Sequence, residues 1–228
     1  ANVAYPFPYN PPYAPAKNPM GIYEREFELG DTAGETYIVF EGVCSCLELY
    51  INGKYAGFSQ GSHLQAEFNI SALVRVGVNT ITAKVRKWCF GSYLEDQDMF
   101  RYNGIFRDVY LLSRPKNHIR DISISTKNNT INIDFEGEGG ISLFDAGKNL
   151  IDRVYARGAA EFVVEEPVMW NAEKPYLYEL VFEYNDERIS QKVGFVTYEI
   201  GKNSEFLVNG TEVKLKGVNH HDTNPKNG

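Results

Sequence analysis

The densest group of side chains able to do chemistry lies between residues 88 and 108. It holds three carboxylates within four residues, Glu95, Asp96 and Asp98, flanked by aromatic rings and two arginines. Carboxylates accept hydrogen bonds from hydroxyl groups, and an aromatic ring can cover the apolar face of a sugar. Acidic clusters are usually solvated turns, but large apolar groups are out of place on a purely solvated turn. This segment is therefore the first candidate for a sugar-contacting site.

The same carboxylates raise the question of whether they cleave the sugar themselves. A retaining glycosidase needs two carboxyl groups about 5 to 5.5 Å apart, on opposite sides of the scissile bond. Glu95 and Asp98 share one short loop, so they would meet similar solvent and have little reason to differ in pKa. The loop is therefore predicted to bind a sugar, and the hydrolytic chemistry is not encoded in this chain.

A second polar group lies near the end of the sequence, where His220 and His221 are followed by Asp222. The His-Glu-x-x-His spacing of a zinc site is absent, and His63 and His118 have no partners at such spacings. Metal binding by the histidine pair is therefore the minority interpretation. The chain also lacks a phosphate-binding glycine loop and a Gly-x-Ser-x-Gly nucleophile turn.

The elements that must position these residues read as short strands separated by turns. Asn52-Gly53 between two apolar runs is a strong hairpin signal, since a type I′ turn needs positive φ at both central positions. Regular strands without crossover helices predict an all-β sandwich or jelly roll over residues 1–115. Its predicted strands are Tyr37–Phe40, Cys46–Ile51, Lys54–Phe58, Ala66–Ile70, Thr80–Val85 and Asp108–Leu112.

A turn-rich break after Arg114 opens a second set of alternating strands, which predicts an immunoglobulin-like β-sandwich over residues 116–198. Residues 199–228 contain one more Asn-Gly hairpin, centred on Asn209-Gly210, and are predicted to begin a third domain. The strands expected in the second domain are Ile119–Ser125, Thr130–Phe135, Ile141–Phe144, Ala160–Val164, Tyr178–Tyr184 and Ile189–Val196.

The composition indicates which classes of binding partner and which cell compartment to expect. A net charge of −7 and a pI near 5.2 disfavour nucleic acid, whose binding relies on clustered Lys and Arg. No apolar run approaches the length of a membrane span, so a membrane role is not expected. Cys44 and Cys46 lie two apart in a strand-like run, which favours buried thiols over a disulfide. Without a disulfide framework, the cytoplasm is the expected compartment.

These motifs together resemble family 2 of the glycoside hydrolases, and within it the β-galactosidases. The most specific stretch, Tyr93-Leu-Glu-Asp-Gln-Asp-Met-Phe-Arg101 followed by Gly104-Ile-Phe-Arg-Asp-Val109, is similar to the signature of the family's N-terminal jelly-roll domain. Three further stretches agree in order: Asn2–Pro6 with Asn18-Pro19, Met169–Tyr178, and Leu207–Gly210 with Leu215–His221. The resemblance nearly spans the chain.

The resemblance implies roles for particular residues. Asn2 and Val3 match positions that touch the galactose, and Asp98 matches the aspartate that contacts the sugar and helps to hold a sodium ion. Asp96 takes that role if the alignment is two residues out. His221 matches the histidine that stabilises the transition state at the mouth of a (β/α)8 barrel, whose first strand this chain would contain. The resemblance further implies sodium and magnesium in the full enzyme and a homo-oligomer.

The chain also departs from the family pattern. It reads Val193-Gly-Phe-Val196 where the family usually has Phe-Arg after Val-Gly, and the opening strands that precede Asn2 in such proteins are missing. The two catalytic glutamates lie downstream in the barrel, so the chain alone is expected to be inactive and to act as the N-terminal part of a larger hydrolase. The alternatives are a free-standing carbohydrate-binding module, a purely structural pair of sandwiches, or part of a β-glucuronidase-like or β-mannosidase-like enzyme.

Overall fold

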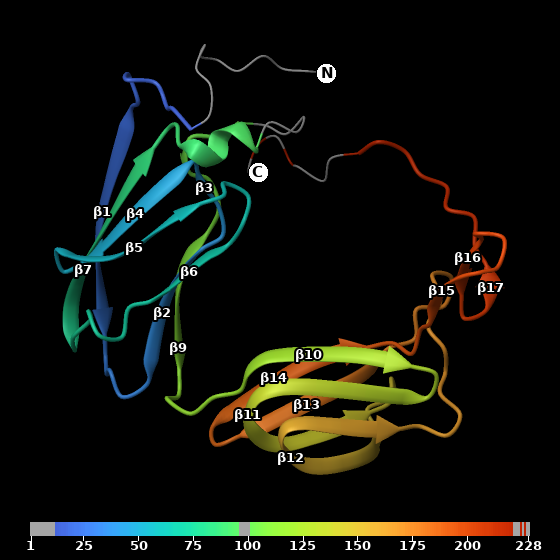
Figure 1. Cartoon of the computed structure of the whole chain (residues 1–228). Helices are drawn as coiled ribbons and strands as arrows, with labels where there is room; N and C mark the ends of the chain where they lie inside the picture. The colour runs from blue at the N-terminus through green and yellow to red at the C-terminus, as the bar shows by residue number, and fades with distance from the viewer. Residues whose placement is uncertain (1–11, 96–100, 221–223, 225, 227–228) are drawn as a thin grey trace. The chain divides into compact units, whose positions relative to one another are not determined.

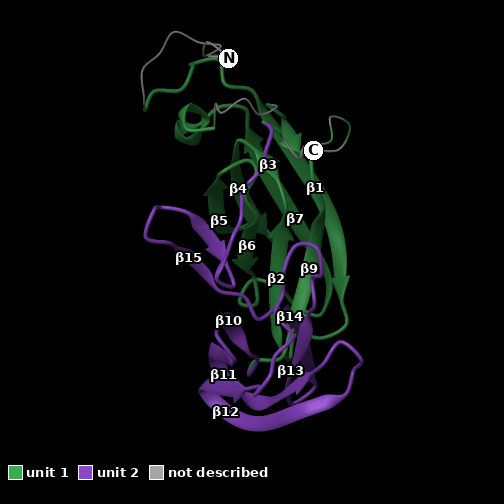
Figure 2. Cartoon of the chain, turned by 90° about the vertical axis from the view of Figure 1, so that its right-hand side faces the viewer, with its two compact units in different colours: residues 1–116, 219–228 green, residues 117–218 purple. Residues whose placement is uncertain are grey.

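The structure is a computed structural model that describes residues 12–95, 101–220, 224 and 226 of the chain. The chain divides into two compact units, residues 1–116 with 219–228 and residues 117–218, which Figure 2 colours separately. In the described ranges, no helix is long and apolar enough to cross a membrane.

Unit 1 is a β-sandwich of two sheets, labelled in Figure 1. The first sheet has the order β1 (Met20–Leu29), β7 (Gly77–Arg86), β4 (Cys46–Ile51) and β5 (Lys54–Gln60). The second has the order β6 (Ala66–Asn69), β2 (Glu35–Phe40) and β9 (Val109–Arg114). Two short strands, β3 (Val43–Cys44) and β8 (Gly104–Ile105), pair with each other.

Alternating apolar residues build the core between these sheets. Leu47, Leu49 and Ile51 of β4 are almost completely buried, and Ile38 and Phe40 of β2 belong to the same cluster. This alternation buries one face of each strand and leaves the other toward solvent. The all-β jelly-roll prediction is confirmed. Strand β1 is absent from the predicted strands because charged residues occupy so many of its positions.

The predicted hairpin turn at Asn52-Gly53 is confirmed, with φ of 51° and 76° at the two residues. The Asn52 side chain also braces the turn. Its Nδ2 donates to the carbonyl oxygen of Leu73 at 2.9 Å, and its Oδ1 accepts from the N–H of Thr80 at 3.0 Å. One residue therefore makes the turn and ties it to two other segments.

Cys44 and Cys46 are buried free thiols, as predicted, and Cys89 is also a buried free thiol. Removal from water raises the pKa of Cys44 and of Cys46 above the ordinary thiol value, because burial penalises the thiolate.

We expect a thiol reagent such as Ellman's reagent at about pH 8 to modify these cysteines far more slowly in the native chain than in urea, because the thiolate is the reacting form. Released chromophore followed over time measures both rates. Stoichiometric reaction of the native chain within the mixing time would contradict the assignment.

Unit 2 contains one curled sheet of five strands in which β11 is central. The first half of β11 pairs with β10 and the second half with β13, while β12 pairs along both halves. The two halves enclose a core that includes Ile133, Leu143 and Phe182, so the immunoglobulin-like sandwich is confirmed. The strands are β10 (Arg120–Lys127), β11 (Thr130–Phe144), β12 (Leu150–Val163), β13 (Tyr178–Tyr184) and β14 (Glu187–Val193).

One sequence prediction in this unit is wrong. The stretches 130–135 and 141–144 are not separate strands, because β11 runs through both. Its register shifts between Asp134 and Glu138, and Gly137 there has a φ of 127°. A glycine in such a conformation allows a bulge that bends the strand, so the glycine-rich stretch bends the strand without ending it.

A small sheet of β15 (Tyr198–Ile200), β16 (Phe206–Val208) and β17 (Thr211–Glu212) follows. The predicted Asn209-Gly210 turn is confirmed, with φ of 52° and 75°. The Asn209 Nδ2 donates to the carbonyl oxygen of Trp170 at 2.8 Å, and its Oδ1 accepts from the N–H of Thr197 at 2.9 Å. That residues 199–228 begin a barrel domain stays a prediction.

Candidate functional site

Residues 88–108, here called the acidic loop, follow β7. The first part of this loop is hydrogen-bonded to the segment that precedes β1. The N–H of Trp88 donates to Asn18 Oδ1 at 2.9 Å, and Asn18 Nδ2 donates to the Trp88 carbonyl oxygen at 2.8 Å. The side-chain amide of Asn18 thus bonds both backbone groups of Trp88, as a neighbouring strand would. A 3-10 helix, η1 (Phe90–Tyr93), follows, and the Tyr93 hydroxyl donates to the Tyr13 carbonyl oxygen at 2.5 Å.

Glu95 fixes the point at which the acidic loop leaves η1. One carboxylate oxygen accepts a short hydrogen bond from the N–H of Ser62, and the other accepts from the Ser62 hydroxyl at 2.8 Å. Ser62 is only 2% exposed, so these bonds are shielded from water. Glu95 therefore ties the residue that follows η1 to Ser62, and both of its carboxylate oxygens are engaged.

Aromatic rings line the return of the loop to β8 and β9. Tyr102 and Phe106 stack with centroids 4.5 Å apart, and the His63 ring meets Phe106 edge-on at 5.4 Å. The Arg107 guanidinium donates to the His63 carbonyl oxygen at 3.2 Å. The Arg101 guanidinium lies 5.8 Å from the centre of the Trp88 ring, within the range of a cation–π contact.

A cavity of about 520 Å³ adjoins Glu95, a volume typical of small-molecule sites. Leu64 and Leu94 on its wall are 72% and 68% exposed, so apolar surface is available in the same cavity as the Glu95 carboxylate. The sequence did not predict that residues 60–64 contribute to the wall of this cavity. The only local pattern there is the Gly61-Ser62 turn after β5. The residues that line this cavity are Gln60, Gly61, His63, Leu64, Phe90, Gly91, Leu94 and Glu95.

The residues predicted to touch the sugar, Asn2, Val3, Asp98 and His221, and the fallback Asp96, lie outside the described residues. The structure describes the bonds that hold the residues before them: Asn18 binds Trp88, Tyr13 accepts from Tyr93, and Ser62 donates to Glu95. Across the described ranges, no group of three or more His, Cys, Asp or Glu side chains is placed to hold a metal ion. A sodium site that includes Asp98 therefore stays a prediction.

We expect Glu95→Ala to lower the free energy of unfolding by about 1–3 kcal/mol, because it leaves the buried N–H and hydroxyl of Ser62 without their acceptors. Glu95→Gln keeps one side-chain oxygen and should cost less. Urea unfolding of the 228-residue chain measures both, with Glu28→Ala on the exposed side of β1 as the control. Equal stabilities of Glu95→Ala and Glu28→Ala would contradict the anchoring role.

Comparison with known proteins gives the class of this sandwich pair. The sugar binding domain of the glycosyl hydrolases family 2 matches residues 1–115, and a second model of that family matches residues 108–196. The chain therefore belongs to the glycosyl hydrolases of family 2.

Among individual relatives, β-galactosidase from Actinobacillus pleuropneumoniae is 39% identical over 246 residues, covering 100% of this chain and 24% of that protein. β-Galactosidase from Staphylococcus xylosus is 38% identical with the same coverage of each. A β-glucuronidase structure from Bifidobacterium dentium superimposes with a TM-score of 0.75 over 92% of this chain and 44% of that one. Its 20% identity establishes the shared fold alone. The chain spans about a quarter of the length of the curated relatives it matches.

Proposed function

We propose that this chain is the N-terminal, non-catalytic part of a longer retaining hydrolase that cleaves terminal β-galactosides. The observation that carries the proposal is that β-galactosidases match the whole chain at 39% identity while the chain spans only 24% of their length. The chain would supply sugar contacts and scaffold, and the two catalytic glutamates would belong to a downstream barrel.

In this proposal Asp98 accepts hydrogen bonds from a sugar hydroxyl and contributes to a sodium site, and Asn2, Val3 and His221 complete the contacts. The bonds of Asn18 and Glu95 support this assignment, because they hold the residues before Asp98. Contacts to parts of the sugar away from the scissile bond can be used to lower the barrier at that bond. We further propose a cytoplasmic homo-oligomer that uses sodium and magnesium and binds no nucleic acid.

The test compares the 228-residue chain with its full-length parent on p-nitrophenyl β-galactoside. We expect turnover by the parent and none by the chain. A parent in which one barrel glutamate is changed to glutamine serves as the inactive control. Turnover by the chain alone would overturn the proposal.

A free-standing carbohydrate-binding module is the second candidate, favoured by the match of residues 1–115 to a sugar binding domain. Calorimetric titration of the chain with galactose separates the two. A true module binds by itself, whereas half of a site that lacks its barrel binds barely at all.

A β-glucuronidase-like or β-mannosidase-like parent is the enzymatic rival, and several solved structures of similar fold are β-glucuronidases. Their identities of 20% and 22% carry the fold and leave the substrate open. Rates of the parent on the aryl galactoside, glucuronide and mannoside decide the matter, and we expect the galactoside to be preferred.

A further inference from the structure

Strand β5 presents two aromatic rings to solvent. Tyr55 is 55% exposed and Phe58 is 59% exposed. In a regular strand, two residues three apart place their side chains on opposite faces, because the faces alternate. In β5, however, the pairing with β4 shifts register between Leu49 and Tyr50, which leaves Ala56 as an extra residue. This β-bulge reverses the alternation, so both rings lie on the same face of the sheet.

The face that carries the two rings is the outer one. Tyr55 and Phe58 stand opposite Tyr50 and Glu48 of β4. Along β4, Tyr50 and Glu48 alternate with leucine and isoleucine residues that are almost completely buried in the core. The two rings therefore point away from the core. Because their partners on β4 are two residues apart, the ring positions are separated by about 7 Å along the strand.

Hydrogen-bonding groups and a third ring lie beside Tyr55 and Phe58. Tyr50 meets Tyr55 edge-on, with ring centroids 5.6 Å apart, and Lys84 Nζ lies 4.5 Å from the centre of the Tyr50 ring. Glu48 stands between Phe58 and Lys84 in the register of the sheet. A carboxylate accepts hydrogen bonds from hydroxyl groups, and an ammonium group donates to them. The outer face thus combines exposed rings with groups that bind hydroxyls.

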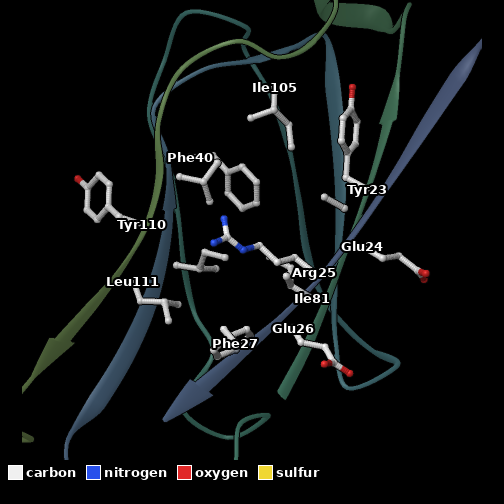
Figure 3. Close-up of a pocket in the computed structure, with 13 residues that line it drawn as sticks. Tyr23, Glu24, Arg25, Glu26, Phe27, Phe40, Ile81, Ile105, Tyr110 and Leu111 are labelled. Atoms are coloured by element: carbon white, nitrogen blue, oxygen red, sulfur yellow. The ribbon is translucent and has the colours of Figure 1, made fainter. Parts of the chain in front are cut away.

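The charges on this face balance one another. Glu48 forms an ion pair with Arg86 at 3.4 Å, and Lys84 lies over an aromatic ring. On β1, Glu24 accepts from the Thr82 hydroxyl at 3.3 Å. In Figure 3, a close-up of the cavity on the core side of β1, the Glu24 side chain points away from that cavity. Two cations and two carboxylates cancel, so the face suits a neutral ligand better than a charged one.

The apolar area of the two rings is small for a protein partner. A large aromatic side chain can bury about 150–250 Å², so the exposed parts of Tyr55 and Phe58 together offer roughly 200 Å². A stable protein interface buries about 800 Å² on each partner. A saccharide needs much less, because a ring can cover the apolar side of a sugar while polar groups bind its hydroxyls. The area and the balanced charges both favour a saccharide over a second copy of the chain.

We propose that the outer face of β4 and β5 binds a neutral oligosaccharide. Successive sugar units lie on Tyr55 and Phe58, and the hydroxyl groups between them bond to Glu48 and Lys84. The β-bulge at Ala56 is what brings the two rings to one face. This site is built on strands and adds a saccharide-binding surface to the proposed function, on which it does not depend.

The test titrates the 228-residue chain with two neutral β-1,4-linked probes, galactotetraose and cellotetraose, which are long enough to cover both rings. We expect one or both to bind in calorimetry with a Kd of about 1 mM. Galactose alone covers one ring and should bind at least about tenfold more weakly. Amide NMR spectra should change most at residues 48–50 and 55–58. Failure of both tetraoses to bind, or spectral changes elsewhere only, would overturn the proposal.

Substitutions of the two rings test their role directly. Tyr55→Ala and Phe58→Ala should each weaken tetraose binding about tenfold or more, because each removes one apolar surface. Tyr55→Phe keeps the ring and should bind like the unchanged chain. Both rings lie on the surface, so the unfolding midpoint should change little. Tyr110→Ala is the matched control, since Tyr110 is a 41% exposed ring on β9 of the other sheet. Unchanged binding in both alanine variants at Tyr55 and Phe58 would count against the proposal.

Asp98→Ala separates this face from the acidic loop. It should leave tetraose binding by the 228-residue chain unchanged. Binding that is lost in Asp98→Ala and retained in Tyr55→Ala would assign the saccharide to the acidic loop and refute the inference. Turnover by the parent and tetraose binding by the chain are separate measurements. An inactive parent with a chain that binds would end the proposed function alone, and an active parent with a chain that does not bind would end this inference alone.

Discussion

Replacing Asp98 by alanine in the full-length parent is expected to lower kcat/KM on an aryl β-galactoside by about 10- to 100-fold. A hydrogen bond between a carboxylate and a sugar hydroxyl contributes about 1.5–3 kcal/mol, and every 1.4 kcal/mol corresponds to a factor of ten in rate. The fall should come without a loss of thermal stability, since the proposed role of Asp98 is to touch the sugar.

Asp186→Ala is the matched control, because Asp186 is an exposed carboxylate in the turn after β13. It should leave both kcat/KM and the unfolding midpoint unchanged. If Asp96→Ala shows the large effect and Asp98→Ala does not, the sugar-contact position lies two residues earlier in the loop. Loss of stability without loss of turnover in both variants would favour a purely structural pair of sandwiches.

Phe182→Ala should destabilise unit 2 by about 3–5 kcal/mol, the usual cost of removing a buried aromatic ring. Phe182 is completely buried and meets Phe135 edge-on, with ring centroids 6.1 Å apart. In a Trp88→Phe background the remaining tryptophan, Trp170, belongs to unit 2, so its fluorescence during urea unfolding reports this unit.

Tyr155→Ala is the control for this second prediction. Tyr155 lies on β12 of the same sheet but is 67% exposed. Its removal should change the free energy of unfolding by less than about 0.5 kcal/mol, as expected for surface positions. A similar cost for both variants would mean that the core is not centred on Phe182.

The strands with clear alternation and the two Asn-Gly turns could be predicted from the sequence, because both signals are local. Leu47, Leu49 and Ile51 alternate as a half-buried strand must, and Asn-Gly supplies two residues that tolerate positive φ. The continuity of β11 could not be predicted in this way. A glycine-rich stretch fits a turn or a bulge equally well, and only pairing with β12 along both halves decides between them.

In the candidate site, too, the features with a local sequence pattern could be predicted, and those that depend on distant residues could not. The acidic, ring-lined segment stands out in the sequence because its residue types are contiguous. The bonds between Glu95 and Ser62 join residues 33 apart, and those between Asn18 and Trp88 join residues 70 apart. Serine and asparagine are common surface residues, so nothing local marks these two as anchors. Long-range polar contacts of this kind become visible only after the sheets have been assembled.

Asn52 and Asn209 each adopt a positive φ and also make side-chain hydrogen bonds to other segments. These two roles restrict which amino acids the two positions can accept. Glycine would tolerate the backbone angles but would supply neither side-chain bond, and aspartate would keep the acceptor while losing the donor. Alanine would fail on both counts. In a library that randomises either codon, selection for folded protein should return the wild-type residue almost alone, whereas the glycine after each can drift toward asparagine at small cost.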